Sequence, residues 1–235
     1  MQLFYNPDIS ATTETFVFDK EESRHIIKVL RKTTGDKVYV TNGLGSLFKT
    51  EIAIASDSKC SVKIIGEQRS EPLGFHLHLA VAPTKMNDRY EWFLEKATEI
   101  GISEITPLIC DRSERTQVKI ERFEKIVVSA MKQSNQYFLP QLNEAMTFRE
   151  FLETNPGGQK FIAHCEESGK RSLKSAVSKG SDVTILIGPE GDFTEKEIAQ
   201  ALESSFIPVS LGGTRLRTET AAIVACHSVI FSNET

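Results

Sequence analysis

The chain has 235 residues, of which 40% are hydrophobic and 26% are charged, and its formal net charge at pH 7 is −4. This composition is typical of a globular protein and excludes a disordered chain, a collagen-like repeat and a short disulfide scaffold. The negative net charge gives no whole-molecule attraction to nucleic acid, so any contact with phosphates depends on local clusters of Lys and Arg.

The sequence predicts a cytosolic protein with no membrane segment and no metal site. The longest apolar stretch near the end, residues 221–226, is far short of the roughly 20 residues that a membrane helix needs. The start, M-Q-L-F-Y-N-P-D, lacks the basic and apolar regions of a signal peptide. No cysteine pair has C-x-x-C spacing, and each cysteine is in or beside an apolar run, so we expect buried, reduced thiols. The four are Cys60, Cys110, Cys165 and Cys226.

The first 70 or so residues are rich in short strands. β-branched or aromatic runs at residues 3–5, 16–18, 37–41, 47–53 and 61–65 are separated by Gly, Asn, Asp and Ser clusters, and Gly43-Leu44-Gly45 is typical of a hairpin turn. One helix, about residues 20–31, interrupts them, with Ile26, Ile27 and Leu30 at helical spacing. Several short strands and a single helix indicate a small barrel.

The pattern changes at the E-P-L-G segment of residues 71–74. Strand-like runs at residues 75–81, 105–109, 161–164, 183–187 and 207–211 are interspersed with helical runs at 88–100, 120–133, 195–203 and 218–231. Such alternation predicts a mostly parallel α/β sheet. We therefore expect two domains, residues 1–72 and residues 73–235.

Charge also differs between the two parts. Residues 1–70 hold ten basic and nine acidic side chains, whereas the remainder holds 18 basic and 23 acidic ones. In the first predicted helix Arg24, Lys28 and Arg31 fall at i, i+4 and i+7, which predicts a basic stripe opposite the apolar positions. Such a stripe is more often a solvated face, and it becomes a candidate phosphate-binding surface only if the rest of the chain indicates RNA.

Several common catalytic motifs are absent. The chain has no G-x-G-x-x-G after a strand, no G-x-x-x-x-G-K-[ST] loop, no G-x-S-x-G elbow and no H-E-x-x-H. The sequence therefore gives no motif support for four enzyme classes: Rossmann dehydrogenases, P-loop nucleotide hydrolases, serine hydrolases and zinc proteases.

Two glycine-rich loops near the C-terminus are the candidates for a site. In I-L-I-G-P-E-G-D-F-T-E-K-E, residues 185–197, a buried strand ends in a turn, and Thr194 and Glu197 form a capping-box pattern that opens a helix. Ligands of open α/β sheets bind at the carboxyl ends of strands, and glycine lets them approach the backbone closely. A tight turn without a ligand explains this first loop equally well.

The second loop is V-S-L-G-G-T-R-L-R-T-E-T-A-A, residues 209–222, again between a strand and a helix. Thr218 is the expected N-cap, and Glu219 suits the positive end of the helix dipole. Arg215 and Arg217 are unfavourable at that end, so they indicate an anionic partner.

Together these loops resemble the 16S rRNA uracil-N3 methyltransferases of the SPOUT class. The resemblance extends over essentially the whole chain: V-L-R at 29–31, K-M-N-D-R at 85–89, K-A-T-E-I-G at 96–101, Q-S at 133–134 and L-P at 139–140. The chain departs from the family at Asp192, where a second Gly is common, and at Asn135-Gln136, where Gly-Arg is common.

The resemblance implies a PUA-like β-barrel followed by a trefoil-knotted α/β methyltransferase domain that binds S-adenosylmethionine (SAM) in the knot. It also implies a homodimer and, as partner, the 16S rRNA of the 30S ribosomal subunit. By position, the cofactor-binding residues are His164, Glu166, Ile187, Gly188, Pro189, Glu190, Gly191, Leu211, Gly212, Leu216, Arg217 and Thr220.

The implied reaction assigns roles to the loop residues. N3 of uracil carries a proton and is a poor nucleophile until that proton leaves, so the enzyme must supply a base or stabilise the developing anion. We expect Arg217 to stabilise the anion or orient the base, and Glu219 to accept the proton, with helix capping as the alternative for Glu219. Glu190 is expected to orient the cofactor or its loop. The expected RNA-binding residues are Arg24, Lys28, Arg31, Lys85, Arg89 and Arg112.

Two other functions compete with this one. The same class contains ribose 2′-O-methyltransferases, and a non-catalytic ribosome-assembly factor would keep the fold without SAM. The intact glycine-rich loops favour an enzyme over an assembly factor. Outside these loops, Trp92 is expected in the core or in a dimer interface, and His76 and His78 are expected to be structural.

Overall fold

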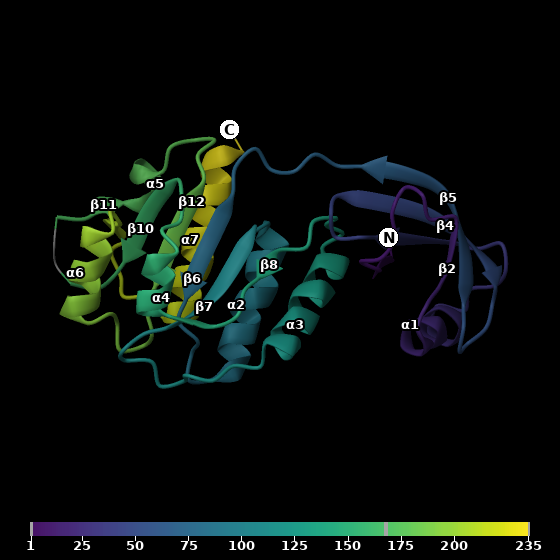
Figure 1. Ribbon diagram of the computed structural model, residues 1–235, viewed down its shortest axis with the longest axis horizontal. Coiled ribbons are helices and arrows are strands. Elements are labelled where there is room, and N and C mark those ends of the chain that lie inside the picture. Colours follow the sequence, from purple (N-terminus) through teal and green to yellow (C-terminus); the bar gives the residue numbers. More distant parts are fainter. Residues whose placement is uncertain (1, 167–168, 235) are drawn as a thin grey trace. The chain divides into compact units, whose positions relative to one another are not determined.

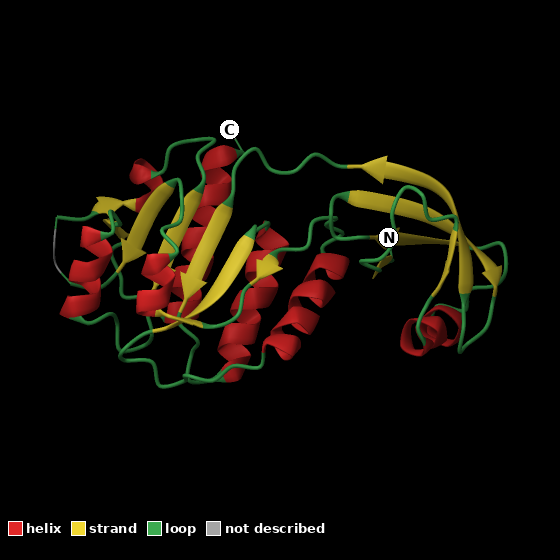
Figure 2. Ribbon diagram, viewed as in Figure 1, coloured by secondary structure: helices red, strands yellow, loops and turns green. Residues whose placement is uncertain are grey.

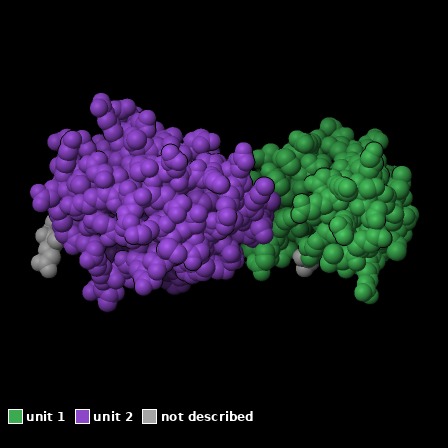
Figure 3. All heavy atoms as spheres, turned by 90° about the horizontal axis from the view of Figure 1, so that it is seen from below, with its two compact units in different colours: residues 1–72, 131–139 green, residues 73–130, 140–235 purple. Residues whose placement is uncertain are grey.

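The computed structural model describes residues 2–166 and 169–234. It divides into two compact units, coloured separately in Figure 3. The first unit consists of Met1–Pro72 and Met131–Leu139, and the second of Leu73–Ala130 and Pro140–Thr235. Each unit has its own hydrophobic core.

The first unit is built on a five-stranded sheet (Figures 1 and 2). Its strand order is β1-β3-β4-β5-β2, with β1 parallel to β3 and all other pairs antiparallel. Phe4, Ile26, Phe48 and Val62 are among its buried core residues. The strands are β1 (Leu3–Tyr5), β2 (Thr15–Val17), β3 (Lys37–Thr41), β4 (Ser46–Ile54) and β5 (Ser61–Arg69).

The hairpin predicted at Gly43-Leu44-Gly45 is confirmed, since it joins the antiparallel strands β3 and β4. Gly43 and Gly45 have positive φ values of 75° and 92°, a conformation that favours glycine. A Cβ on Gly45 would also collide with the ring of Phe138. The N–H of Gly45 donates to the carbonyl of Tyr137 (2.8 Å), which fastens residues 131–139 to this unit.

The helix of the first unit differs from the prediction. α1 (Lys20–Arg24) continues as a π-helix, η1 (His25–Val29), and Arg31 lies beyond it with a φ of 54°. The prediction of a basic stripe over residues 24–31 assumed the i, i+4, i+7 spacing of an α-helix. It is wrong, because a π-helix has wider turns and the helix ends before Arg31. The side chains of Arg24, Lys28 and Arg31 are all exposed.

The second unit contains a parallel sheet, as predicted. Its order is β11-β13-β10-β12-β6-β7-β8, and β9 pairs with β7. Every strand pair in it is parallel. The strands are β6 (Leu77–Val81), β7 (Glu104–Ile109), β8 (Gln141–Leu142), β9 (Met146–Thr147), β10 (Gln159–Ala163), β11 (Arg171–Ser172), β12 (Val183–Ile187) and β13 (Ile207–Ser210).

Helices cover both faces of this sheet (Figure 2). On one face Phe151 of α4 and Ile198 of α6 pack with Ala80, Ile162 and Leu186 of the strands. On the other face α2 and α7 pack together, and α7 lies against β6 and β12 (Figure 1). The helices are α2 (Asn87–Ile100), α3 (Ile120–Gln133), α4 (Phe148–Glu153), α5 (Leu173–Ala176), α6 (Glu195–Glu203) and α7 (Thr218–Asn233).

α3 ends at a left-handed residue, Asn135, whose φ is 54°. The N–H of Gln136 donates to the carbonyl of Met131 (3.1 Å), which is the long closing bond of a Schellman motif. Asn is one of the few residues other than Gly that adopt this conformation readily, which accounts for Asn at a position where the resembled family often has Gly. Across residues 2–166 and 169–234, no helix combines the length and the apolarity needed to cross a bilayer.

Candidate functional site

The three loops predicted to bind a cofactor begin at one edge of the parallel sheet. Ala163 at the end of β10 pairs with Ile187 of β12 and with Val209 of β13, and Ile187 pairs with Val81 of β6. The carboxyl ends of these strands are therefore aligned. The segments at residues 164–166, 188–191 and 211–217 leave the sheet side by side, at the edge where open α/β sheets bind ligands.

The turn after β12 is held by its own sequence and by its neighbours. The Thr194–Glu197 capping box is confirmed, and Glu197 Oε1 also accepts the N–H of Asp111 (2.9 Å). A Cβ on Gly188 would lie 3.1 Å from ring atoms of the buried Phe193, so this position has little room for a side chain. The backbone of the turn is thus closely packed against the core at this position.

The start of α7 corrects one prediction. Its N-cap is Arg217, whose side chain makes no capping bond, and Thr218 is the first helical residue. The Thr218 hydroxyl instead donates to the carbonyl of Gly188 (3.1 Å) and thereby joins the second loop to the first. The prediction that Thr218 caps the helix is therefore wrong, because a tertiary acceptor takes its hydroxyl.

The segments that follow β6, β7 and β12 are bonded to one another at the same edge. Glu190 Oε1 accepts the N–H of Lys85 (2.9 Å). Arg112 Nη1 donates to the carbonyls of Gly191 (3.0 Å) and Phe193 (3.3 Å), and Arg115 donates to the carbonyls of Thr84 and Lys85. The turn is therefore pre-organised by bonds to backbone carbonyls and amides.

Three predicted site residues at this edge carry buried polar atoms without a protein partner. The unpaired atoms are the two ring nitrogens of His164, Oε2 of Glu190 and Oε2 of Glu219. Burial, followed by the charge of Lys170, lowers the pKa of His164, so its ring is neutral at pH 7. Because native proteins rarely leave buried polar atoms unpaired, these atoms indicate a polar ligand with several hydrogen-bonding groups.

The six candidate RNA-binding residues fall into two groups, one in each unit. In the second unit Lys85, Arg89 and Arg112 follow β6 or β7, near the loops just described. A bond to Glu114 raises the pKa of Lys85, and Arg89 Nε lies 3.9 Å from Glu219 Oε1. In the first unit Lys28 pairs with Asp57 at 3.4 Å, and both side chains are largely exposed.

Comparisons with known proteins agree with this geometry. Residues 70–230 match the family model described as RNA methyltransferase domain, and residues 18–65 match the model described as RNA methyltransferase PUA domain. The ribosomal RNA small subunit methyltransferase E of Buchnera aphidicola (subsp. Acyrthosiphon pisum) is 31% identical over 220 residues, which cover 89% of this chain and 85% of that protein. The chain belongs to the ribosomal RNA small subunit methyltransferase E family.

Solved structures of relatives extend over the whole chain. A probable rRNA-methyltransferase from Porphyromonas gingivalis has a TM-score of 0.92 and 38% identity, and the match covers 100% of this chain and 99% of that one. The ribosomal RNA small subunit methyltransferase E of Neisseria gonorrhoeae, bound to S-adenosyl methionine, has a TM-score of 0.85 and 27% identity, with 96% and 95% covered. The predicted fold class, a PUA-like domain followed by a parallel α/β methyltransferase domain, is confirmed.

The loop edge of this methyltransferase suits a cofactor of the SAM type. The unpaired Oε2 of Glu190 is an acceptor, which matches the amino and hydroxyl donors of such a molecule, and the neutral His164 ring can both donate and accept. Among the described residues, no group of three or more His, Cys, Asp or Glu side chains is placed to hold a metal ion.

Sequence reasoning missed several residues at this edge. Arg112 was expected on RNA, whereas the structure engages its guanidinium with the turn after β12. Arg115 bonds the carbonyls of Thr84 and Lys85 in the segment after β6, and no local pattern pointed to it. Cys165 is exposed, so the prediction of four buried thiols is wrong at this position, where the chain leaves the sheet.

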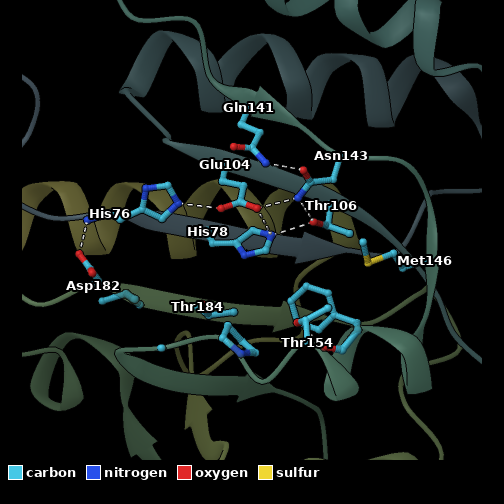
Figure 4. A pocket seen from close by; sticks show the side chains of 14 residues that line it. His76, His78, Glu104, Thr106, Gln141, Asn143, Met146, Thr154, Asp182 and Thr184 are labelled. Atoms are coloured by element: carbon cyan, nitrogen blue, oxygen red, sulfur yellow. Dashed lines mark hydrogen bonds and ion pairs between the residues drawn. The ribbon is translucent and has the colours of Figure 1, made fainter.

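The opposite edge of the sheet holds a polar cleft of about 460 Å³ (Figure 4). Glu104 Oε2 is 2.7 Å from His76 Nε2, and Thr106 Oγ1 is 2.8 Å from His78 Nε2. Asn143 donates to both Glu104 and Thr106. The structure therefore supports the expected structural role of both histidines, since each bonds a neighbouring strand and lies away from the cofactor loops.

Proposed function

We propose that this chain transfers the methyl group of SAM to N3 of one specific uridine in the 16S rRNA of the small ribosomal subunit, and that it does so in the cytoplasm. The observation that carries the proposal is the convergence of three loops at one sheet edge, where His164, Glu190 and Glu219 keep unpaired buried atoms. The names of the relatives and the methyltransferase-domain match support the substrate class.

In this proposal the three loops would hold the cofactor at the carboxyl ends of β10, β12 and β13. Ile187–Gly191 and Leu211–Thr220 supply backbone N–H and C=O groups, and His164 and Glu166 close the site from β10. SAM, when bound, supplies an electrophilic methyl group on a sulfonium. The braced turn contributes mainly by fixing the position of that group, because an in-line displacement depends strongly on alignment.

The chain's own side chains activate the base. Glu219 is 7% exposed, and we assign it as the acceptor of the N3 proton. Arg217 is exposed at the start of the same helix, and we assign it to the negative charge that develops on the uracil oxygens as the proton leaves. The guanidinium of Arg89 lies beside this carboxylate, with its Nε 3.9 Å from Glu219 Oε1.

The deciding experiment uses the purified full chain, labelled SAM and small ribosomal subunits that lack the modification, followed by nucleoside mass spectrometry. We expect 3-methyluridine. A 2′-O-methylated nucleoside would contradict the assigned target atom and favour the ribose methyltransferase. Absence of both transfer and SAM binding would favour the assembly factor.

We also propose that the chain works as a homodimer through α2 and α7. α7 is apolar on nearly all sides, which is typical of a helix that is covered all round. Yet Phe231 of α7 and Trp92 of α2 are 49% and 44% exposed within one chain. The expectation that Trp92 lies in the core is therefore wrong, and the interface remains as its proposed place.

Replacing both Trp92 and Phe231 with glutamate should convert the dimer to a monomer, because charged side chains would be desolvated in the interface. Light scattering coupled to size-exclusion chromatography measures the mass directly. As a control, glutamate at the exposed Ile54 and Ile65 of the first unit should leave the mass unchanged. A wild-type chain that is monomeric at micromolar concentration would contradict the proposal.

We assign residues 1–72 to RNA binding, with Arg24, Lys28 and Arg31 as phosphate contacts. Changing all three to glutamine should weaken binding of a 16S rRNA fragment and reduce the slope of log K against log salt by roughly 2 to 3, because each phosphate contact contributes about 0.7 to 0.9. The matched control changes the exposed sheet residues Lys37, Lys49 and Lys63 instead. Equal slopes for both triple variants would contradict a role specific to Arg24, Lys28 and Arg31.

A further inference from the structure

Asp192 links two of the candidate cofactor loops through a single carboxylate. It follows Gly191 with a φ of 62°, in the left-handed region. Its Oδ1 accepts the N–H of Phe193 (2.9 Å), within its own turn, and its Oδ2 accepts the N–H of Cys165 (2.8 Å), at the exit of β10. Residues 27 positions apart in the chain are thereby held together.

The turn itself does not require this carboxylate. A left-handed residue after Gly191 is all that the backbone needs, and glycine supplies that conformation with no side chain. The bond to Cys165 is a charge-assisted link between loops, a stronger type than a bond between neutral groups. Its effect falls on the β10 exit, where the adjacent residue is His164.

The bond between Asp192 and Cys165 affects ligand binding through the adjacent His164. Its ring is buried, and neither ring nitrogen has a protein partner. Lys170 Nζ holds its carbonyl (2.7 Å) while Asp192 holds the next backbone N–H. The peptide that joins His164 to Cys165 is thus fastened on both sides, so the backbone that carries the ring is held before a ligand arrives.

We propose that Asp192 is a positioning residue for the cofactor: by holding the N–H of Cys165 it orders the loop at residues 164–166 in its binding conformation. The inference rests on the proposed placement of SAM at this edge. Without the carboxylate the loop must be ordered during binding, and this ordering reduces the affinity.

The test compares Asp192→Gly and Asp192→Asn with the wild-type chain. Glycine keeps the left-handed backbone and removes the link, whereas asparagine tolerates the conformation and keeps one acceptor oxygen. We expect the Kd for S-adenosylhomocysteine, measured by calorimetry, to rise about 5- to 20-fold in Asp192→Gly and less than about 3-fold in Asp192→Asn. In the methyl-transfer assay KM for SAM should rise in parallel, while kcat at saturating SAM changes less than about 2-fold.

Asp182 provides a matched control. Its Oδ1 accepts the N–H of His76 (2.7 Å), so it makes the same type of bond at the opposite edge of the sheet. Asp182→Gly should lower the melting temperature as Asp192→Gly does, without changing the Kd for S-adenosylhomocysteine. An equal loss of affinity in both glycine variants would overturn the proposal in favour of general destabilisation.

Hydrogen exchange of the Cys165 amide, measured without ligand, distinguishes a failure of the role inferred for Asp192 from a failure of the proposed cofactor placement. Faster exchange in Asp192→Gly with an unchanged Kd would show that the link exists but does not position the cofactor, and would overturn the inference alone. A wild-type chain that binds neither SAM nor S-adenosylhomocysteine would overturn the placement of the cofactor as well.

Discussion

Arg217→Ala is expected to slow single-turnover methyl transfer by about 100- to 1000-fold, the usual loss when a group that stabilises a developing anion is removed. Arg217 stands at the N-cap of α7, and its exposed side chain makes no capping bond. The helix terminus adds partial positive charge at the same place, so a cation is favourable there only when an anion is present. SAM should still bind with a Kd within about 10-fold of wild type, because the loops supply most of its contacts.

Two comparison variants make the result specific to charge stabilisation. Arg217→Lys keeps the charge but loses the planar fork of donors, so we expect an intermediate rate. Glu219→Gln should also be slow, but its rate should recover as the pH rises, because solvent then removes the N3 proton. Arg217→Ala should show no such recovery. Wild-type single-turnover rates in Arg217→Ala with SAM bound would show that another residue stabilises the anion.

Acidification is expected to destabilise the second unit through His78, by about 3 kcal/mol between pH 6.5 and pH 4, since each unit of pKa difference is equivalent to about 1.4 kcal/mol. Burial lowers the pKa of His78 from 6.5 to about 4, although the charge of Glu104 opposes the change. In this pH range the unfolded chain binds a proton that the folded chain excludes. The contribution is therefore fully present above pH 6.5 and is lost as the pH falls toward 4.

The groups around His78 determine the lower end of this pH range. Burial alone would raise the pKa of Glu104, but His78, Asn143 and His76 outweigh it and lower that pKa. Glu104 consequently adds a further loss of stability below its ordinary value of 4.5. Asp182 lines the same cleft and bonds the backbone of His76 (Figure 4).

Urea unfolding of the full chain at pH 7.5, 6.5, 5.5 and 4.5 measures this dependence, with fluorescence of the single tryptophan, Trp92, as the probe of the second unit. His78→Gln should flatten the dependence between pH 6.5 and 4.5. His76→Gln is the matched control, since it removes the neighbouring histidine, whose side chain is half exposed. An unchanged pH slope in His78→Gln would show that other groups carry the acid sensitivity.

Regular elements were predictable because their signals are local. The apolar run of β12 and the helical spacing of α3 are contained in a few successive residues, so the sequence predicted residues 183–187 and 120–133 as the structure has them. The capping box of Thr194 and Glu197 likewise needs only two residues that are three positions apart. The loops with the glycine-rich motifs were found for the same reason.

Short elements were missed because their stability comes from neighbours. β8, β9 and β11 have two residues each and exist as strands only by pairing with β7 or β13. α4 and α5 have six and four residues, too few for a periodic pattern. The π-helical turn after α1 was also missed, since its apolar spacing resembles that of an α-helix.

The sequence by itself determined the strands of three or more residues, the long helices and the chemical character of the loops, because hydrophobic periodicity, capping and glycine content act between residues close in the chain. Only the tertiary structure decided which polar atoms pair and which stay free. Thr218 bonds Gly188, Arg112 bonds Gly191 and Asp192 bonds Cys165, across 30, 79 and 27 positions. The ring nitrogens of His164 and Oε2 of Glu219 remain unpaired for the same physical reason: a hydrogen bond requires two groups within about 3 Å, and only the folded structure sets that distance.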